Sequence, residues 1–142
     1  MKISMASDHG GLELKNHIAD YLKGLGHTVV DYGTYSKDRC DYPDFARPAA
    51  LAVANGECER GILVCTTGIG VSMVANKIKG VRCALCLNDD MAKMTRAHNN
   101  ANVIAMGQKY VDLDMAKKIA DNFLNTAFEG GVHAERVNKI ED

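Results

Sequence analysis

Strand-like and helix-like segments alternate along the whole chain, and this alternation restricts the fold more than any other feature of the sequence. Short apolar runs predict five strands, at residues 2–6, 27–30, 61–65, 81–87 and 102–106. Segments with a helical spacing of apolar residues lie between and after them, at residues 11–25, 43–54, 70–77, 89–97 and 112–126. Such units predict an α/β fold, a three-layer, Rossmann-like sandwich with a five-stranded parallel sheet.

Length and charge restrict what the chain can bind. A length of 142 residues without repeats or linkers suits a single domain over residues 1–142. Its 17 basic and 18 acidic residues give a net charge of −1, which argues against a nucleic-acid partner. Because no apolar run approaches membrane-spanning length and residues 1–7 are too short for a secretory leader, we expect a cytoplasmic protein with no membrane partner.

The five cysteines favour free thiols in a reducing compartment, because their number is odd and no leader precedes them. Cys83 and Cys86 have the spacing of a redox or metal motif. They lie inside an apolar run that predicts a buried strand, and a zinc site would need a second pair of ligands. We interpret both as small core residues, with a redox role as the alternative.

Candidate functional residues gather where predicted strands end, which is where ligands bind in parallel sheets. The most informative of these segments is residues 65–72, in which Cys65 and a Gly-rich turn precede a helix. Backbone N–H groups that converge beside a helix N-terminus favour an anion, and the same position stabilises a thiolate that can act as a base. The alternatives are an ordinary tight turn and a structural cysteine.

Two other segments contain titratable residues. Asp8 and His9 follow the first strand, ahead of two glycines that permit close approach of a ligand, although Asp8 can also serve only as a helix cap. His98 ends the fourth helix, which runs back toward the amino ends of the strands. If His98 acts with Cys65, it most simply comes from a second subunit; otherwise it stabilises a helix C-terminus.

Several short stretches together form a known pattern. They are Ser7–Gly11 with Leu14-Lys15, Asp41–Asp44, Gly61–Cys65 with Thr67–Gly70, Ala75–Lys77, His98-Asn99 with Asn102-Val103, and Glu129–Gly131 with His133 and Arg136. In these residues the chain resembles ribose-5-phosphate isomerase type B, in the family that also includes the galactose-6-phosphate isomerase subunits. The resemblance covers essentially the whole chain in order.

The resemblance implies an aldose–ketose isomerase that acts through an enediolate, without a metal or organic cofactor. It implies catalytic roles for Cys65 as the base, His98 as the ring-opening acid/base, Asp8 and Thr67. The substrate-binding residues that it implies are His9, Tyr42, Thr66, Gly68, Ile69, Gly70, Asn99, Lys109 and Arg136. It also implies a homodimer or homotetramer whose active sites lie at the subunit interface, with the tail 127–142 packed on a partner subunit.

Three positions depart from the common pattern of the family: Thr66 stands where glycine is usual, and Lys109 and Val132 stand where arginine is common. Lysine keeps the charge of arginine but lacks its bidentate geometry. The expected substrate is ribose 5-phosphate, interconverted with ribulose 5-phosphate. The alternatives are a six-carbon sugar phosphate, either allose 6-phosphate or galactose 6-phosphate, and a non-catalytic sugar-phosphate sensor.

Overall fold

The computed structural model describes residues 1–141 and contains the predicted five-stranded sheet, in which every strand pair is parallel. The strands are β1 (Lys2–Ser7), β2 (Thr28–Asp31), β3 (Arg60–Cys65), β4 (Cys83–Leu85) and β5 (Val103–Gly107). Their spatial order is β2-β1-β3-β5-β4, so β2 and β4 are the edge strands. The predicted α/β sandwich is confirmed, and the structure adds the strand order.

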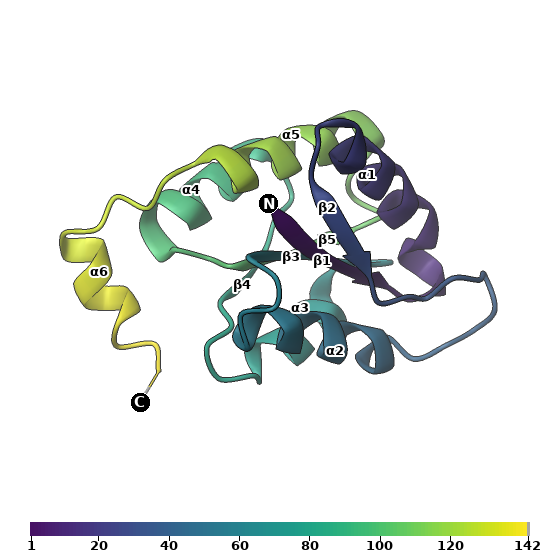
Figure 1. Cartoon of the computed structure of the whole chain (residues 1–142), viewed down its shortest axis with the longest axis horizontal. Helices are drawn as coiled ribbons and strands as arrows, with labels where there is room; N and C mark the ends of the chain where they lie inside the picture. Colours follow the sequence, from purple (N-terminus) through teal and green to yellow (C-terminus); the bar gives the residue numbers. More distant parts are fainter. Residues whose placement is uncertain (142) are drawn as a thin grey trace.

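Helices cover both faces of the sheet (Figure 1). One layer contains α1 (Leu12–Gly24), α4 (Asp89–Asn99) and α5 (Leu113–Asn125), and the other contains α2 (Pro43–Ala54) and α3 (Ile69–Asn76). The last helix, α6 (Val132–Val137), projects from the body beside α4 and has no buried residue. Within residues 1–141, no helix combines the length and the hydropathy that a membrane crossing needs.

Strand β3 lies in the middle of the sheet and separates two apolar clusters. Ile62 and Val64 point into the cluster beneath α1 and α5, whereas Leu63 and Cys65 point into the cluster beneath α2 and α3. All four are 5% exposed or less, as predicted for a strand covered on both faces. Cys65 is therefore a buried residue at the carboxyl end of a central strand.

The helix ends follow the turn residues of the sequence. Gly26, which follows α1, has φ +92°, a conformation that glycine adopts without strain. The Asp112 side chain accepts a hydrogen bond from the N–H of Met115 at 2.8 Å, which confirms it as the N-cap of α5. Helix α2 begins with Pro43 after Tyr42, which makes no side-chain capping bond.

The strand predicted at residues 81–87 is shorter in the structure. Only Cys83–Leu85 pair with β5, because Val81 belongs to a turn closed onto Ile78 and Leu87 is half exposed ahead of α4. The side chain of Asn76 bonds both backbone groups of Cys83, at 2.8 and 2.9 Å. Asn76 thereby occupies hydrogen-bonding groups that an edge strand would otherwise offer to another strand.

Candidate active site

Three loops meet at the carboxyl end of the sheet, after β1, β3 and β5. Their backbones are in close contact: a Cβ atom on Gly11 would lie 2.7 Å from the carbonyl of Val64, and one on Gly107 would lie 2.5 Å from the carbonyl of Thr67. The N–H groups of Gln108 and Lys109 donate to the carbonyls of Cys65 and Thr66 at 3.0 and 2.9 Å. The loops therefore form one rigid floor.

The Cys65 thiol lies at the centre of this floor. Its Sγ atom accepts a hydrogen bond from the N–H of Gly68 at 3.1 Å, and its side chain is buried. Gly68 has φ +78°, which turns the chain sharply into α3 and suits glycine. The turn thus aims an N–H dipole at the sulfur, an arrangement that stabilises negative charge on it.

The first turn of α3 supplies further donors. The Thr67 hydroxyl accepts the N–H of Ile69 at 3.3 Å, so this donor is already engaged. Among residues 1–141, no partner is bonded to the N–H groups of Gly70 and Val71, two of the free donors that begin a helix. The Tyr42 ring lies against Gly70, where a Cβ atom would be 2.6 Å from it. An anion at this helix end would therefore meet free N–H groups beside Tyr42.

The loop after β1 contributes Asp8 and His9. The Asp8 carboxylate accepts the N–H of Gly10 at 2.9 Å and caps the 3-10 turn His9–Gly11, so the capping interpretation of Asp8 is confirmed. His9 is exposed, and its Nδ1 accepts the N–H of Cys40 at 3.3 Å. In a neutral imidazole this bond leaves the proton on Nε2, which makes Nε2 a donor toward the solvent side.

Thr66 and Lys109 lie at the rim of the floor. The hydroxyl of Thr66 lies against Gly10, in space that a Cβ atom on Gly10 would need. Lys109 is exposed, and its Nζ lies 5.7 Å from the centre of the Tyr110 ring. The threonine therefore fills part of the space between two loops, and the lysine remains free to meet an anion.

A second group of candidate residues lies at the opposite end of the sheet, beyond the amino ends of the strands. His98 ends α4, and its Nε2 lies 3.5 Å from the Glu129 carboxylate. The His98 ring stacks on that of His133 with centroids 4.1 Å apart and planes 9° apart. Asn99 and Arg136 are both exposed. Asn99 follows His98 at the end of α4, and Arg136 lies one turn after His133 in α6.

The buried side chain of Arg96 holds together the segments that carry this second group. Its guanidinium bonds the Asn100 side chain and the Ala101 carbonyl at 2.8 and 2.7 Å, and the Thr126 carbonyl at 3.3 Å. Burial, together with the nearby Arg60 and Arg82, lowers the pKa of Arg96 to about 10, so it stays charged at neutral pH. The side chain joins the end of α4 to the start of the tail and so positions His98 relative to Glu129.

The candidate residues predicted from sequence thus divide into two groups. Three of them, His98, Asn99 and Arg136, belong to the amino-end group, and the other ten lie at the carboxyl end around Cys65. The length of β5 and β3 lies between the two groups. Val103 pairs with Gly61 at the amino end, and Gly107 pairs with Cys65 at the carboxyl end. Four residues of strand span about 13 Å, so His98 and Cys65 of one chain lie at opposite ends of the sheet.

Sequence reasoning did not include Glu129 and His133 among the site residues. The structure brings both to His98, and their ligand atoms lie within 4.8 Å of one another. Cys40 was also missed, and its Sγ lies 3.8 Å from Nδ1 of His9. One indication of Glu129 and His133 was present in the sequence, namely their position in the Gly-rich segment that precedes Arg136.

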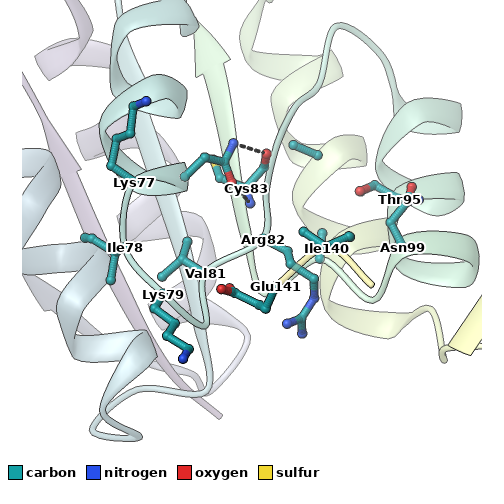
Figure 2. Close-up of a pocket in the computed structure, with 13 residues that line it drawn as sticks. Lys77, Ile78, Lys79, Val81, Arg82, Cys83, Thr95, Asn99, Ile140 and Glu141 are labelled. Atoms are coloured by element: carbon teal, nitrogen blue, oxygen red, sulfur yellow. Dashed lines mark hydrogen bonds between the residues drawn. The ribbon is translucent and has the colours of Figure 1, made fainter. Parts of the chain in front are cut away.

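A pocket of about 640 Å³ opens at the β4 edge, between the connection from α3 to β4 and the C-terminal tail (Figure 2). Lys77, Lys79 and Arg82 line it on one side, and Asn99 and Ile140 on the other. The pocket therefore adjoins the amino-end group and is lined by none of the residues around Cys65.

Cys83 and Cys86 lie apart from both groups. Burial raises the pKa of the Cys86 thiol to about 12, and burial also raises the pKa of Cys83. A thiol that keeps its proton at neutral pH is a poor nucleophile and a poor metal ligand. These values favour the interpretation of both as packing residues.

Comparisons with known proteins match nearly the whole chain. The family model described as Ribose/Galactose Isomerase matches residues 3–140. Ribose-5-phosphate isomerase B of Escherichia coli is 45% identical over 98% of this chain and 93% of its own. D-erythrulose-4-phosphate isomerase of Pectobacterium atrosepticum is 42% identical over 99% of this chain and 93% of its own.

Solved structures agree in fold. Ribose-5-phosphate isomerase B of Clostridium thermocellum has a TM-score of 0.97 at 52% identity, over 99% of this chain and 95% of that one. The Mycoplasma genitalium enzyme with bound ribulose 5-phosphate has a TM-score of 0.94 at 45% identity, over 98% and 93%. The fold is that of the aldose–ketose isomerases of phosphorylated sugars. The chain belongs to the Ribose/Galactose Isomerase family.

Proposed function

We propose that this protein interconverts ribose 5-phosphate and ribulose 5-phosphate through an enediolate, with Cys65 as the base. The observation that carries the proposal is the Cys65 thiol, buried at the end of a central strand with the Gly68 N–H 3.1 Å from its sulfur. A thiolate held in this way can remove a proton that is only weakly acidic in water.

The reaction moves two hydrogens. The Cys65 thiolate takes the proton from C2 of the open-chain aldose, and the electron pair of that bond forms the C1–C2 double bond of the enediolate. The same thiol then returns the proton to C1, while a proton passes between the two oxygens. The free N–H groups of Gly70 and Val71 are suited to hold the oxygen on which charge develops, and one such donor contributes roughly 3–4 kcal/mol.

Opening of the sugar ring needs an acid and a base before the proton transfer. We assign this role to His98, whose Nε2 lies 3.5 Å from the Glu129 carboxylate. A carboxylate at this distance can orient the imidazole for proton transfer. His9, Arg136 and Lys109 are assigned to the phosphate, because all three are exposed groups able to bind an anion.

Because Cys65 and His98 of one chain lie at opposite ends of the sheet, the proposed site takes one residue from each of two chains. A twofold axis perpendicular to the sheet at the β4 edge sets the carboxyl end of one protomer beside the amino end of the other. Exposed apolar side chains suited to such a contact surround this edge, namely Ile69, Met73, Leu87, Met91 and Ile140. The blocked edge of β4 favours side-chain packing over sheet extension.

The tail 127–142 belongs to the same proposal. Its helix α6 has no buried residue and stands away from the body, although it contains His133 and Arg136. A helix that presents functional side chains without a core of its own is best explained by packing against another protomer. Residues 1–142 then act as one domain whose tail completes a neighbouring site.

The names of the two relatives given above specify sugar phosphates of different length, ribose 5-phosphate and erythrulose 4-phosphate. The length of the sugar is therefore a separate part of the proposal. Thr66 lies against Gly10 and occupies space between the two loops that border Cys65. A five-carbon sugar phosphate is proposed over the six-carbon alternative because the relative and the two solved structures named above at 45–52% identity are ribose-5-phosphate isomerases.

The deciding experiment is a kinetic panel with erythrose, ribose, allose and galactose phosphates, each measured on the wild-type protein and on Cys65→Ala. We expect the highest kcat/KM for ribose 5-phosphate and nearly complete loss in Cys65→Ala. A higher kcat/KM for another sugar phosphate would replace the proposed substrate. Undiminished turnover in a folded Cys65→Ala protein would refute the assigned base.

A further inference from the structure

The amino-end group contains three side chains that the isomerase reaction does not require to be so close. His98, Glu129 and His133 each offer one ligand atom, and all three atoms lie within 4.8 Å of one another. Imidazole nitrogen and carboxylate oxygen are ligands for divalent zinc, cobalt and nickel. We propose that this His98–Glu129–His133 cluster binds one such ion, and that the bound ion inhibits the enzyme.

The geometry of two of the ligands already suits an ion. Metal–nitrogen and metal–oxygen bonds of about 2.0–2.2 Å in a tetrahedral site place ligand atoms roughly 3.3–3.5 Å apart. The His98 Nε2 and the nearer Glu129 oxygen are 3.5 Å apart. The backbone N–H of Glu129 bonds the Ala97 carbonyl at 3.0 Å, which fixes the tail against α4 at this point. The two ligand atoms therefore already have the spacing that an ion requires, on backbone segments that are bonded to each other.

The third ligand must rotate. The His98 and His133 rings are nearly parallel, and the lone pairs of parallel rings do not converge on one ion. His133 lies on α6, a helix with no buried residue, and is itself only half buried. A turn of its ring about the side-chain bonds thus disturbs little packing and lets its nitrogen face the other two ligands.

The ligand set also restricts which ion fits. Calcium and magnesium prefer six or more oxygen ligands, whereas this cluster offers two nitrogens and one carboxylate. Arg136, one turn after His133 on α6, adds a positive charge that opposes weakly held cations. The cluster therefore favours zinc, cobalt or nickel over magnesium and calcium, and its fourth position is left for water.

The inhibitory consequence rests on the proposed function. An ion on Nε2 of His98 prevents the imidazole from carrying a second proton, which an acid for ring opening needs, and it neutralises the Glu129 carboxylate beside it. The bound ion would thus remove an acid/base group and not supply one. Binding itself depends only on the three side chains, so it can be tested without measuring turnover.

Titration calorimetry with Co²⁺ on the full-length chain, made in a Cys40→Ser background, tests the site. This background removes a competing thiol–imidazole pair at the other end of the sheet, in which Cys40 Sγ lies 3.8 Å from His9 Nδ1. We expect one ion per chain, with affinity at least about tenfold weaker in Glu129→Gln and in His133→Gln. The matched control His17→Gln, which changes an exposed histidine of α1, should bind as the parent does.

Absorption spectra identify the ligands independently. Nitrogen and oxygen ligands give only weak visible bands with Co²⁺, whereas a thiolate adds a strong near-ultraviolet charge-transfer band. Equal affinity in Glu129→Gln and the parent, or a thiolate band at one equivalent, would overturn the site. Turnover should fall with the same midpoint as binding and return on chelation. Binding at the cluster with turnover unchanged would overturn the inhibitory role.

Discussion

The Sγ atom of Cys65 and the backbone N–H of Gly68 are joined by a 3.1 Å hydrogen bond that closes the turn between β3 and α3. This single contact connects a side chain assigned to proton transfer with the glycine that begins the helix. It predicts that changes at Cys65 affect turnover strongly and stability weakly.

Replacing Cys65 with alanine or serine should lower kcat by at least about 10²-fold, since neither side chain provides a base near neutral pH. The alanine variant also leaves the Gly68 N–H without its acceptor, which costs about 1 kcal/mol of unfolding free energy. Steady-state kinetics and urea unfolding measure the two effects. Cys58→Ala, a change at another buried thiol, is the control and should keep turnover. Equal losses in both variants would indicate a general packing defect.

Mixing two inactive proteins, Cys65→Ala and His98→Ala, should restore activity if each site takes one residue from each chain. Random exchange makes half of the dimers mixed, and each mixed dimer keeps one of two sites, so about a quarter of wild-type activity is expected. Native mass spectrometry verifies the exchange. Proven exchange with no recovered turnover would place both residues in the site of a single chain, contrary to the topology of β3 and β5.

Arg96→Lys should damage both stability and turnover, although Arg96 lies outside the proposed site. One ammonium group cannot reach the Asn100, Ala101 and Thr126 acceptors that the guanidinium spans. We expect a loss of about 2–3 kcal/mol of unfolding free energy. We also expect kcat to fall more than KM rises, since His98 loses its position. Thermal unfolding and kinetics test this, with the exposed Arg47→Lys as control. A stable, fully active Arg96→Lys protein would contradict the assigned positioning role.

Lys15 is fully buried, and its Nζ bonds the Asp31 carboxylate at 2.8 Å and the Thr34 carbonyl. Lys15→Met leaves both acceptors without this partner and should lower the unfolding free energy by about 2–4 kcal/mol, less than for a fully buried pair because Asp31 is partly exposed. Chemical denaturation measures the loss. The exposed Lys23→Met on the same helix should change stability by less than about 0.5 kcal/mol. A similar loss in both variants would argue against the ion pair.

The buried Cys86 thiol predicts a dependence of stability on alkaline pH. Burial raises its pKa to about 12 in the folded state, whereas an unfolded thiol titrates near 8.5. The folded chain then holds a proton that the unfolded chain releases, so stability falls as pH rises above about 9. Relative to Cys86→Ala, the unfolding free energy should fall by up to about 1.4 kcal/mol per pH unit between pH 9 and 11. Urea unfolding at several pH values checks this, and identical slopes in the two proteins would refute it.

Local patterns carried most of the fold prediction. The five strands, the caps at Asp112 and Gly26, and the Gly-rich turn after Cys65 depend on residues close in sequence, so periodicity and turn chemistry were sufficient to predict them. The short β4 differs because its pairing is limited by contacts from Asn76 and Ile78 that an apolar run does not reveal.

The amino-end group was harder to predict. The direction of α4 already indicated that His98 lies away from Cys65. The stacking of His98 on His133 and the clamp of Arg96 depend on how the tail folds back on α4, a long-range packing event with no periodic signal. The strand order has the same origin, because it is decided by which apolar faces meet after the strands have formed.

If each site takes one residue from each of two chains, as proposed, the division of the candidate residues between opposite ends of the sheet has a genetic consequence. In a cell with two copies of the gene, a product lacking only Cys65 still offers His98 to a normal partner, so each mixed dimer keeps one working site. A product lacking both residues spoils both sites of every mixed dimer that it enters. Two defects that are each recessive alone would become dominant when they occur together in one chain.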